Sequence, residues 1–498
     1  MMDAPGKSDR PIVPMKSPNN AESSVAEAME RRERTKGNSL EQAPRRTQGR
    51  DSVMRPLERV RQAARKDRKQ RFTALLHHVY DGERLRAAYF ALKRDAVAGI
   101  DGETWQHYGE HLEENLHALA GRLKRGAYRA NPVRRVYISK ADGRLRPLGV
   151  PTLEDKIVQR AVVEVLNAIY ETEFVGFSYG FRPGRSPHQA LDALSVGIQQ
   201  RKVNWVLDAD IRSFFDTLDH GWLLRFVEHR IGDRRIGRLI QQWLSAGVLE
   251  HGQWTPGDEG TVQGGSISPL LSNLFLHYVF DLWTHRWRRT QARGEMIVVR
   301  FADDFVVGFE HRQEAERFLD DLRERFAKFG LALHPDKTRL IAFGRFAVER
   351  RRARGEGKPE TFNFLGFTHI CGTSREGRFA VRRQTMRQRW QTKLQAVARD
   401  LWRRRHDPVP TMGEYLRAVV RGHFNYYGVP WNTPALRAFR AAVARVWQRV
   451  LASRSQRGHV GWTRMWRLVA RWLPPVCVCH PHPTARLIVT TRGGSRMR

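Results

Sequence analysis

Two adjacent carboxylates, Asp303 and Asp304, interrupt an apolar stretch that otherwise has the pattern of buried β-structure. Apolar residues 297–299 precede the acids and residues 305–307 follow them, which predicts two strands that meet at the acids. Burying two like charges side by side is costly unless a positive group meets them. The stretch therefore predicts a nearby cation, either a bound metal ion or a basic side chain.

A second acidic segment favours the metal ion. Asp208 and Asp210 end another β-type run, "WVLDADI" (205–211). If the two strand regions are neighbours in one sheet, three carboxylates converge and could hold two divalent cations. Oxygen ligands and phosphate-bearing substrates favour Mg²⁺. The alternative is that arginines such as Arg212 or Arg300 pair with these acids.

The charge of the chain indicates a polyanionic partner. Its 498 residues include 87 Lys and Arg against 52 Asp and Glu, which gives a formal net charge of +35. Such an excess is typical of nucleic-acid-binding proteins. No apolar run approaches the ~20 residues of a membrane-spanning helix, and no signal-peptide pattern opens the chain, so a membrane surface is disfavoured. Three cysteines cannot build a disulfide framework, which favours a reducing cytoplasm.

Composition divides the chain into five segments. Residues 1–53 are polar with few aromatics and are predicted to be largely disordered. Residues 54–130 have apolar residues at helical spacing. Residues 131–372 alternate short β-branched runs with amphipathic stretches of helix length, which predicts an α+β domain. Residues 373–453 and 454–498 are helical in pattern and very basic.

The two C-terminal segments together hold 25 Arg and one Lys against four acidic residues, and seven of the 14 tryptophans. An apolar stripe over 386–401 and helical stretches at about 411–427 and 433–453 predict a bundle of three helices. Most of the tryptophans fit the core of such a bundle. A solvated face does not explain the charge imbalance, so we interpret the basic surface as facing nucleic acid.

Beyond these patterns, ordered segments of the chain resemble the bacterial group II intron-encoded reverse transcriptases/maturases. "RFADDFVVGF" resembles the family's hairpin of catalytic acids, and "DADIRSFFDTLDH" resembles its first catalytic segment. Further segments match in the family's order: "RPLGVPTLEDKIVQRAV", "YGFRPGRSPHQAL", "GTVQGGSISPLLSNLFLHYVFD", "LALHPDKTRLIAFG", "FNFLGFT" and "LRAVVRGHFNYYG". The resemblance runs from about residue 75 into the C-terminal region.

The resemblance implies a right-hand polymerase fold of the α+β class. Fingers and palm, with an antiparallel sheet and helices, would cover 131–372, after a helical N-terminal extension and the start of the fingers over 54–130. An all-helical thumb or maturase domain would cover 373–453, and a small basic DNA-binding region 454–498. The implied activity is RNA-directed DNA synthesis with two Mg²⁺ ions, for which Mn²⁺ could substitute.

The resemblance also assigns roles to individual residues. Asp210, Asp303 and Asp304 take the catalytic and metal-binding positions, and the Ile211 carbonyl completes one metal site. The implied nucleotide-binding residues are Phe215, which excludes a 2′-hydroxyl, Lys140 and Arg146 at the triphosphate, Gln263 in "QGGSISP", and Lys337 at the pyrophosphate. The implied primer or template residues are Phe301, Gly264 and Arg182.

Some of these residues have simpler interpretations. Phe215 could pack in the core beside Phe214, and Lys140 or Arg146 could be a solvated hairpin residue. Phe301 departs from the family, which most often has tyrosine at this position. The missing hydroxyl affects primer positioning and leaves the metal ligands unchanged.

The implied partners are dNTPs, target DNA and the intron RNA whose splicing and mobility a maturase assists. The expected location is the bacterial cytoplasm, in a nucleoid-associated ribonucleoprotein, and a monomer and a homodimer on RNA are both open. No HNH-type module follows the basic region, so we expect no second-strand DNA cleavage. The alternatives are a splicing-only RNA-binding protein, which the intact acids disfavour, and a related polymerase recruited to spacer acquisition or phage defence.

Overall fold

The computed structural model describes residues 13, 14, 56–139, 145–250, 253–255, 260, 264–374, 376–454 and 460–488. Apart from residues 13 and 14, the segment predicted to be disordered lies outside the described residues, as do Lys140 and Gln263. Within the described part, the chain combines helices with mainly antiparallel sheets. The prediction of an α+β fold is therefore confirmed.

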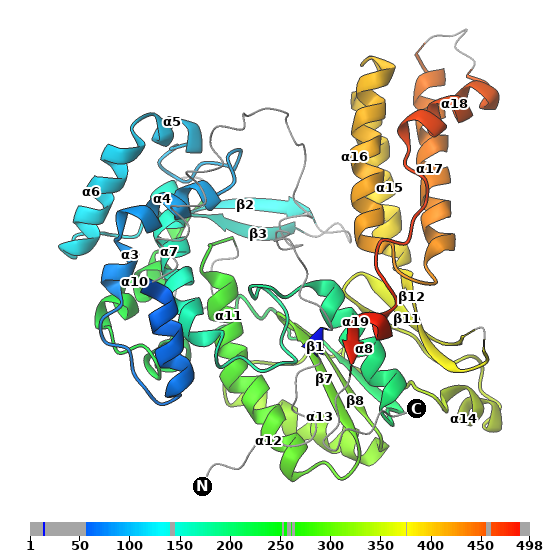
Figure 1. The fold of residues 1–498 in the computed structure, drawn as a ribbon, viewed down its shortest axis with the longest axis horizontal. Helices are drawn as coiled ribbons and strands as arrows, with labels where there is room; N and C mark the ends of the chain where they lie inside the picture. Colours follow the sequence, from blue (N-terminus) through cyan, green and yellow to red (C-terminus); the bar gives the residue numbers. More distant parts are fainter. Residues whose placement is uncertain are drawn as a thin grey trace.

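Helices form the N-terminal part of the described chain, on the left in Figure 1. A helix over 56–66 comes first. The helical spacing of Leu85, Ala88 and Tyr89 becomes a buried helix face. This helix begins at Asp81, whose side chain accepts a hydrogen bond from the Arg84 amide. The elements are α3 (Leu76–Val79), α4 (Gly82–Ala91), α5 (Trp105–Glu110) and α6 (Leu112–Lys124).

A four-stranded sheet, the outer sheet, has the strand order β3-β2-β5-β6. Its strands are β2 (Val133–Ser139), β3 (Leu145–Val150), β5 (Val248–Glu250) and β6 (Gln253–Thr255). β2 and β3 form an antiparallel hairpin, whereas β2 and β5 pair in parallel. A parallel pair requires a long crossover, which residues 151–247 supply. The expected antiparallel pairing is found in β2–β3 and β5–β6, and β2–β5 is a parallel pair between them.

A second four-stranded sheet, the central sheet, has the order β7-β8-β4-β9 with antiparallel neighbours throughout. Its strands are β4 (Trp205–Ala209), β7 (Met296–Phe301), β8 (Asp304–Phe309) and β9 (Arg339–Ala342). The surrounding helices are α7 (Leu153–Tyr170), α8 (Pro187–Gln200), α9 (His220–Glu228), α10 (Arg234–Ser245), α11 (Ser268–Leu276), the π-helix η2 (His277–Asp281), α12 (Leu282–Thr290), α13 (Arg312–Ala327) and α14 (Ala347–Ala353).

The central sheet is buried on both faces because its apolar residues alternate along the strands. Val206, Val299 and Val306 belong to one core cluster, which includes apolar residues of α8. Leu207 and Val307 belong to another, which includes apolar residues of α13. The interrupted apolar stretch of the sequence is the β7–β8 hairpin of this sheet, as predicted.

A three-stranded antiparallel sheet leads from the central sheet into an upright helical bundle (Figure 1). The helices predicted at 411–427 and 433–453 are α16 and α17, and Leu401, Leu416 and Trp447 lie fully buried between the bundle helices. The elements are β10 (Phe362–Phe364), β11 (Phe367–Thr373), β12 (Phe379–Thr385), α15 (Arg387–Arg403), α16 (Val409–Tyr427), α17 (Thr433–Ala452) and α18 (Trp462–Trp472).

The last described elements return to the central sheet. Helix α19 (Pro483–Arg486) contacts α8, and β13 (Leu487–Ile488) pairs with β1 (Val13–Pro14). None of the described helices is both long and apolar enough to cross a membrane.

Candidate active site

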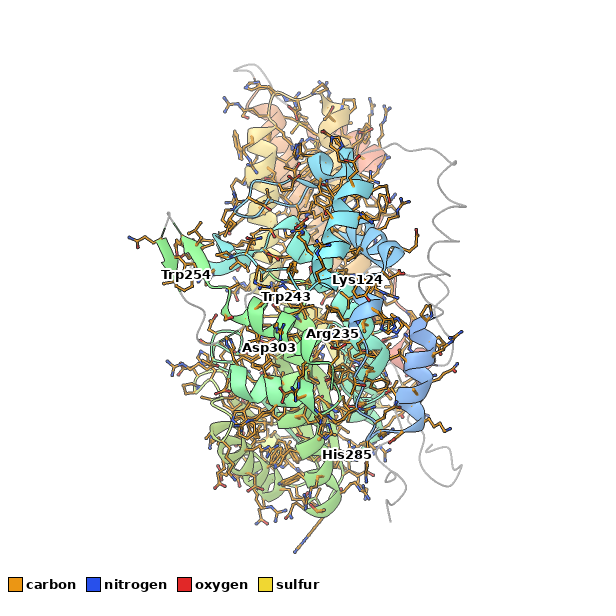
Figure 2. The ribbon with its side chains drawn as sticks, turned by 90° about the vertical axis from the view of Figure 1, so that its left-hand side faces the viewer. Lys124, Arg235, Trp243, Trp254, His285 and Asp303 are labelled. Atoms are coloured by element: carbon orange, nitrogen blue, oxygen red, sulfur yellow. The ribbon has the colours of Figure 1, made fainter. Side chains whose placement is uncertain are left out.

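The three acids predicted to be catalytic reach one end of the central sheet from two neighbouring strands. In the antiparallel β4–β8 pair, Ala209 lies opposite Phe305, so Asp210 at the end of β4 comes beside Asp304 at the start of β8. Asp303 precedes Asp304 in the turn between β7 and β8. Figure 2 shows Asp303 near the middle of the molecule, below the projecting strands that carry Trp254.

The carboxylates at this end of the sheet repel one another. The pKa of Asp304 is raised to about 7, first because surrounding protein removes water from the carboxylate and then because Asp303, Asp210 and Asp208 are negatively charged. Burial also raises the pKa of Asp208 to about 6, against the effect of the Arg339 guanidinium 3.6 Å away. Asp304 itself remains exposed at the protein surface. This concentration of negative charge favours cation binding.

Lys337 contacts Asp210, whereas Arg300, considered as a partner of the acid pair, does not pair with it. The ammonium group of Lys337 lies against the Asp210 carboxylate, with about half of the lysine side chain exposed at 54%. Arg300 is buried and pairs with Asp281 of η2, with 2.6 Å between Nη2 and Oδ2. The interpretation of Arg300 as the partner of the acid pair is therefore wrong.

The carboxylate oxygens of Asp210, Asp303 and Asp304 are chemically suited to bind a divalent cation. Among the described residues, no three Asp, Glu, His or Cys side chains are already close enough together to hold a metal ion. One of the carboxylates, that of Asp210, is held by Lys337. Carboxylate oxygens that repel one another are nevertheless the ligands that Mg²⁺ prefers. Metal binding at Asp210 would replace the contact with Lys337.

The backbone beyond Asp210 presents the Ile211 carbonyl to the same region. Ile211 forms an antiparallel bridge to the segment 332–334, where two hydrogen bonds of 2.8 Å engage the Arg212 amide and the Asp210 carbonyl. In such a pair, the N–H and C=O of the central residue point away from the partner segment. The Ile211 carbonyl therefore points to the side where β8 and its acids lie.

Phe215 lies on the chain segment that leaves the catalytic strand. It is half-buried, and its ring packs edge-on against the buried Phe214, with 5.3 Å between centroids. Gly260, at φ +80°, approaches this segment so closely that a Cβ would lie 2.6 Å from the Phe215 carbonyl oxygen. The position thus combines packing with a partly exposed ring, and its role in nucleotide selection stays a prediction.

Gly264 lies against the outer sheet. It has φ +120°, and a Cβ would lie 2.5 Å from the Gly149 carbonyl oxygen of β3. Arg146 lies on the same strand, but its side chain is outside the described atoms, and Lys140 is outside the described residues. The close approach that glycine permits is therefore to the outer sheet, and the triphosphate contacts stay predictions.

Arg182 does not fit its predicted role at the primer or template. Its side chain is buried, and its guanidinium pairs with Glu171 at 3.0 Å. It also donates hydrogen bonds to the carbonyls of Val175 and Ser178, at 2.8 and 2.7 Å. Because these contacts hold the loop before α8 together, we correct the assignment of Arg182 to an internal anchor of that loop.

Phe301 pairs with Asp304 across the hairpin, and its ring faces that of Phe181, with 6.3 Å between centroids. Phe181 is 39% exposed and has φ +56°, an unusual conformation for a bulky residue. An exposed, strained aromatic beside the catalytic turn is a further candidate for contact with primer or template. Nothing in the sequence pattern distinguished it, because its strain is visible only in the backbone.

A two-residue turn, Leu365–Gly366, joins β10 and β11 near the acids. Both residues have positive φ, +48° and +79°, which suits a type I′ hairpin turn but is unusual for leucine. The hydroxyl of Tyr426, at the end of α16, donates to the Leu365 carbonyl at 2.8 Å. Burial raises the pKa of Tyr426, and the charge of Asp304 contributes to the shift. Tyr426 therefore connects the helical bundle to the turn between β10 and β11.

Comparison with known proteins identifies the family model and several relatives. Residues 138–369 match the model described as reverse transcriptase (RNA-dependent DNA polymerase). The chain is 33% identical to Protein YkfC of Escherichia coli over 296 residues, which is 52% of this chain and 77% of that protein. It is 36% identical to the group II intron-encoded protein LtrA of Lactococcus lactis, over 45% of this chain and 37% of LtrA. It is 27% identical to nuclear intron maturase 4 of Arabidopsis thaliana, over 30% of this chain and 18% of that protein.

Proposed function

The chain belongs to the reverse transcriptase family, among the group II intron-encoded reverse transcriptases and maturases, and from this premise we propose how it acts. Its enzyme class is RNA-directed DNA polymerase. The proposed reaction copies intron RNA into DNA from a primer at the target site. In this proposal the central sheet is the palm, the outer sheet belongs to the fingers, and the bundle of α15–α17 is the thumb.

One observation carries the proposal, which is the meeting of Asp210, Asp303 and Asp304 at one end of the central sheet. Their oxygens, with the Ile211 carbonyl, would hold two Mg²⁺ ions. When bound, such ions would activate the primer 3′-hydroxyl and stabilise negative charge on the departing pyrophosphate. Lys337, released from Asp210, would then place its ammonium group near the phosphates, where it could steady or protonate the leaving group.

Other residues would select and place the reactants. The exposed part of the Phe215 ring would lie under the sugar and exclude a 2′-hydroxyl, so that dNTPs are preferred. Lys140, Arg146 and Gln263 would bind the incoming nucleotide. Phe301, together with the strained Phe181 beside it, would contact the primer end.

The basic bundle supports a second function, the binding of intron RNA to assist its splicing and mobility. From residue 373 onward, 25 Arg and one Lys face four acidic residues, and this charge suits phosphate contacts with RNA and target DNA. Exposed Trp462 and Trp466, with ring centroids 5.5 Å apart on α18, add surfaces on which bases could stack. The proposed setting is a bacterial cytoplasmic ribonucleoprotein.

Primer extension tests the polymerase proposal. The wild type, the double variant Asp303→Ala/Asp304→Ala and the control Asp320→Ala would each extend a DNA primer on an RNA template with dNTPs and Mg²⁺. Asp320 is a suitable control because it is an exposed acid on α13, with 70% of its side chain exposed. We expect extension by the wild type and the control, and none by the double variant. Equal extension by all three would refute the assignment of the acids.

Splicing assays test the RNA-binding half of the proposal. Self-splicing of the flanking intron at near-physiological Mg²⁺ would be compared with and without the protein. We expect faster splicing with the protein, and also with the Asp303→Ala/Asp304→Ala variant, because RNA binding does not require the catalytic acids. No difference with and without the wild type would remove the maturase role.

A further inference from the structure

Beneath the catalytic turn lies an arginine whose hydrogen-bond donors are all used. Arg300 is 0% exposed, and its Nε and Nη2 atoms donate to the Asp281 carboxylate at 2.7 and 2.6 Å. Nη2 also donates to the Ser178 hydroxyl at 2.7 Å, and Nη1 donates to the Asn273 side-chain oxygen at 3.0 Å. The fifth bond runs from Nη1 to the Ala302 carbonyl at 2.9 Å. A guanidinium has five N–H groups, so every one has an acceptor.

The last of these bonds holds the turn that carries the catalytic acids. Ala302 immediately precedes Asp303 and has φ +57°, a left-handed conformation that costs energy for any residue with a Cβ. Gly180 packs against this turn so tightly that a Cβ would lie 2.2 Å from the Ala302 nitrogen. Asn273 donates to the Gly180 carbonyl at 2.6 Å while accepting from Arg300, so one residue supports both contacts.

Both the side chain and the backbone of Arg300 are fixed. Its amide donates to the Phe177 carbonyl at 2.9 Å, and its carbonyl accepts from the Tyr179 amide at 2.8 Å. Asp281 is the last residue of the π-helix η2, whose wider turn changes which side chains face the sheet. The arginine thus connects a loop, a helix and a π-helix to one strand end.

We propose that Arg300 is a positioning residue that fixes the backbone of the turn at Ala302, so that Asp303 and Asp304 stand in register with Asp210. Stability alone does not account for the cluster, because buried ion pairs are often no more stabilising than apolar residues of the same volume. What the cluster provides is a fixed geometry for a strained backbone directly before the acids. This inference rests on the proposed function, in which the three acids together hold divalent cations.

The variant Arg300→Lys tests the proposal because it retains the charge but has three N–H donors and no planar fork. We expect kcat for single-nucleotide addition to fall about 10²-fold from misplacement of the acids. KM for the dNTP and the dissociation constant for primer–template should change little, since those contacts lie elsewhere. The variant Ser178→Ala removes one acceptor and should lower kcat about threefold in the same direction.

A direct binding measurement separates positioning from general loss of activity. The free Mn²⁺ signal in electron paramagnetic resonance would be followed in a complex with a dideoxy-terminated primer, an RNA template and dNTP. We expect Mn²⁺ to bind Arg300→Lys about tenfold more weakly than the wild type. This readout does not depend on turnover.

Arg230→Lys is the matched control. Arg230 is also 0% exposed and donates to the carbonyls of Gln70 and Arg68 at 2.9 and 2.8 Å, in the N-terminal part of the fold. We expect it to lower the melting temperature, as Arg300→Lys does, but to leave kcat and Mn²⁺ binding at wild-type values.

The outcomes distinguish failure of the inference about Arg300 from failure of the proposed polymerase function. Wild-type kcat and Mn²⁺ binding in Arg300→Lys would overturn the inference, and so would an equal loss in Arg230→Lys. If Arg300→Lys does not fold, the smaller change expected in Ser178→Ala decides in its place, and an unchanged Ser178→Ala would overturn the inference. If the wild type extends no primer, the proposed function fails, and the Mn²⁺ comparison still decides whether Arg300 positions the acids.

Discussion

Two charged clusters lie on opposite faces of the β7–β8 hairpin, and they differ in how their charge is met. On one face lie Asp210, Asp303 and Asp304, and the pKa of Asp304 is raised to about 7 because nearby protein removes water from its carboxylate and its acidic neighbours repel it. On the other face, Arg300 is fully buried, and each of its N–H groups has an acceptor. The acidic cluster consists of carboxylates that repel one another, whereas every N–H group in the buried cluster has an acceptor.

The difference separates the face of the hairpin that could bind a ligand from the face that holds its backbone in place. A fully satisfied buried network fixes a geometry and offers nothing to a ligand. Repulsion within a group of carboxylates lowers the stability of the folded state, and bound cations restore that stability. Charged groups that repel one another therefore mark the proposed functional face, whereas fully hydrogen-bonded groups mark its structural support.

The largest expected effect is the loss of catalysis in Asp304→Asn. Replacing a metal ligand should lower the rate of primer extension about 10³-fold or more, since several kcal/mol of transition-state stabilisation are lost. The same change removes one repelling charge, so without divalent ions the variant should be at least as stable as the wild type in urea. The gain should not exceed about 1 kcal/mol because Asp304 is open to solvent. A clear loss of stability would break the comparison.

Loss of a carboxylate from the buried cluster should lower the stability of the protein, unlike its loss from the acidic cluster. Asp281→Asn keeps the shape of the side chain but leaves the buried Arg300 without its counter-charge. We expect the free energy of unfolding in urea to fall by about 3–5 kcal/mol. A change as small as that of Asp304→Asn would show that the two faces do not differ in the way described.

Lys337→Met tests the contact between the Lys337 ammonium group and the Asp210 carboxylate. The ammonium group contacts Asp210 and is half exposed, so its loss should change the stability by no more than about 1 kcal/mol. If the lysine serves the departing pyrophosphate, the rate of addition should fall on the order of 10²-fold. Lys337→Arg is the control and should retain part of the rate. Full activity in Lys337→Met would confine the lysine to pairing with Asp210.

A smaller effect is expected from His369, a buried group that stays neutral. It is 0% exposed on β11, stacks on Phe362 at 4.7 Å, and burial lowers its pKa to about 3. The unfolded chain binds a proton near pH 6.5 and the folded chain does not, so stability is full above this pH and falls below it. Between pH 7.5 and pH 5, this residue should account for about 2 kcal/mol of lost stability. Urea unfolding at both pH values should show a shallower pH dependence in His369→Phe.

The open face could be predicted from the sequence to a large extent. Asp210, Asp303 and Asp304 each sit at the end of an apolar β-run, and strand alternation with one antiparallel pairing is enough to bring them together. The helices of the C-terminal bundle could be predicted equally well, because their apolar residues follow the helical period. These features depend on local pattern, which a single sequence contains.

The supporting face could not be predicted in the same way. Arg300 was considered as a partner of the catalytic acids because it is close to them in sequence, yet it pairs with Asp281 across the other face. The π-helix that turns Asp281 toward Arg300 cannot be predicted from the spacing of apolar residues. Arg182 was misassigned for a related reason, since its partner Glu171 and its carbonyl acceptors are set by the path of a loop. Tertiary hydrogen bonding decides such cases, and sequence spacing does not contain it.

The hydrogen bond from Tyr426 to the Leu365 carbonyl has a mechanical consequence. It joins the last turn of a long bundle helix to a strained two-residue turn near the acids. A rigid helix acts as an arm, so a small rotation of the bundle about its base is transmitted to this turn. In the proposed polymerase, this hydrogen bond and the packing of Phe367 on Tyr426 and Tyr427 would link the grip of the bundle on a duplex to the placement of the primer end.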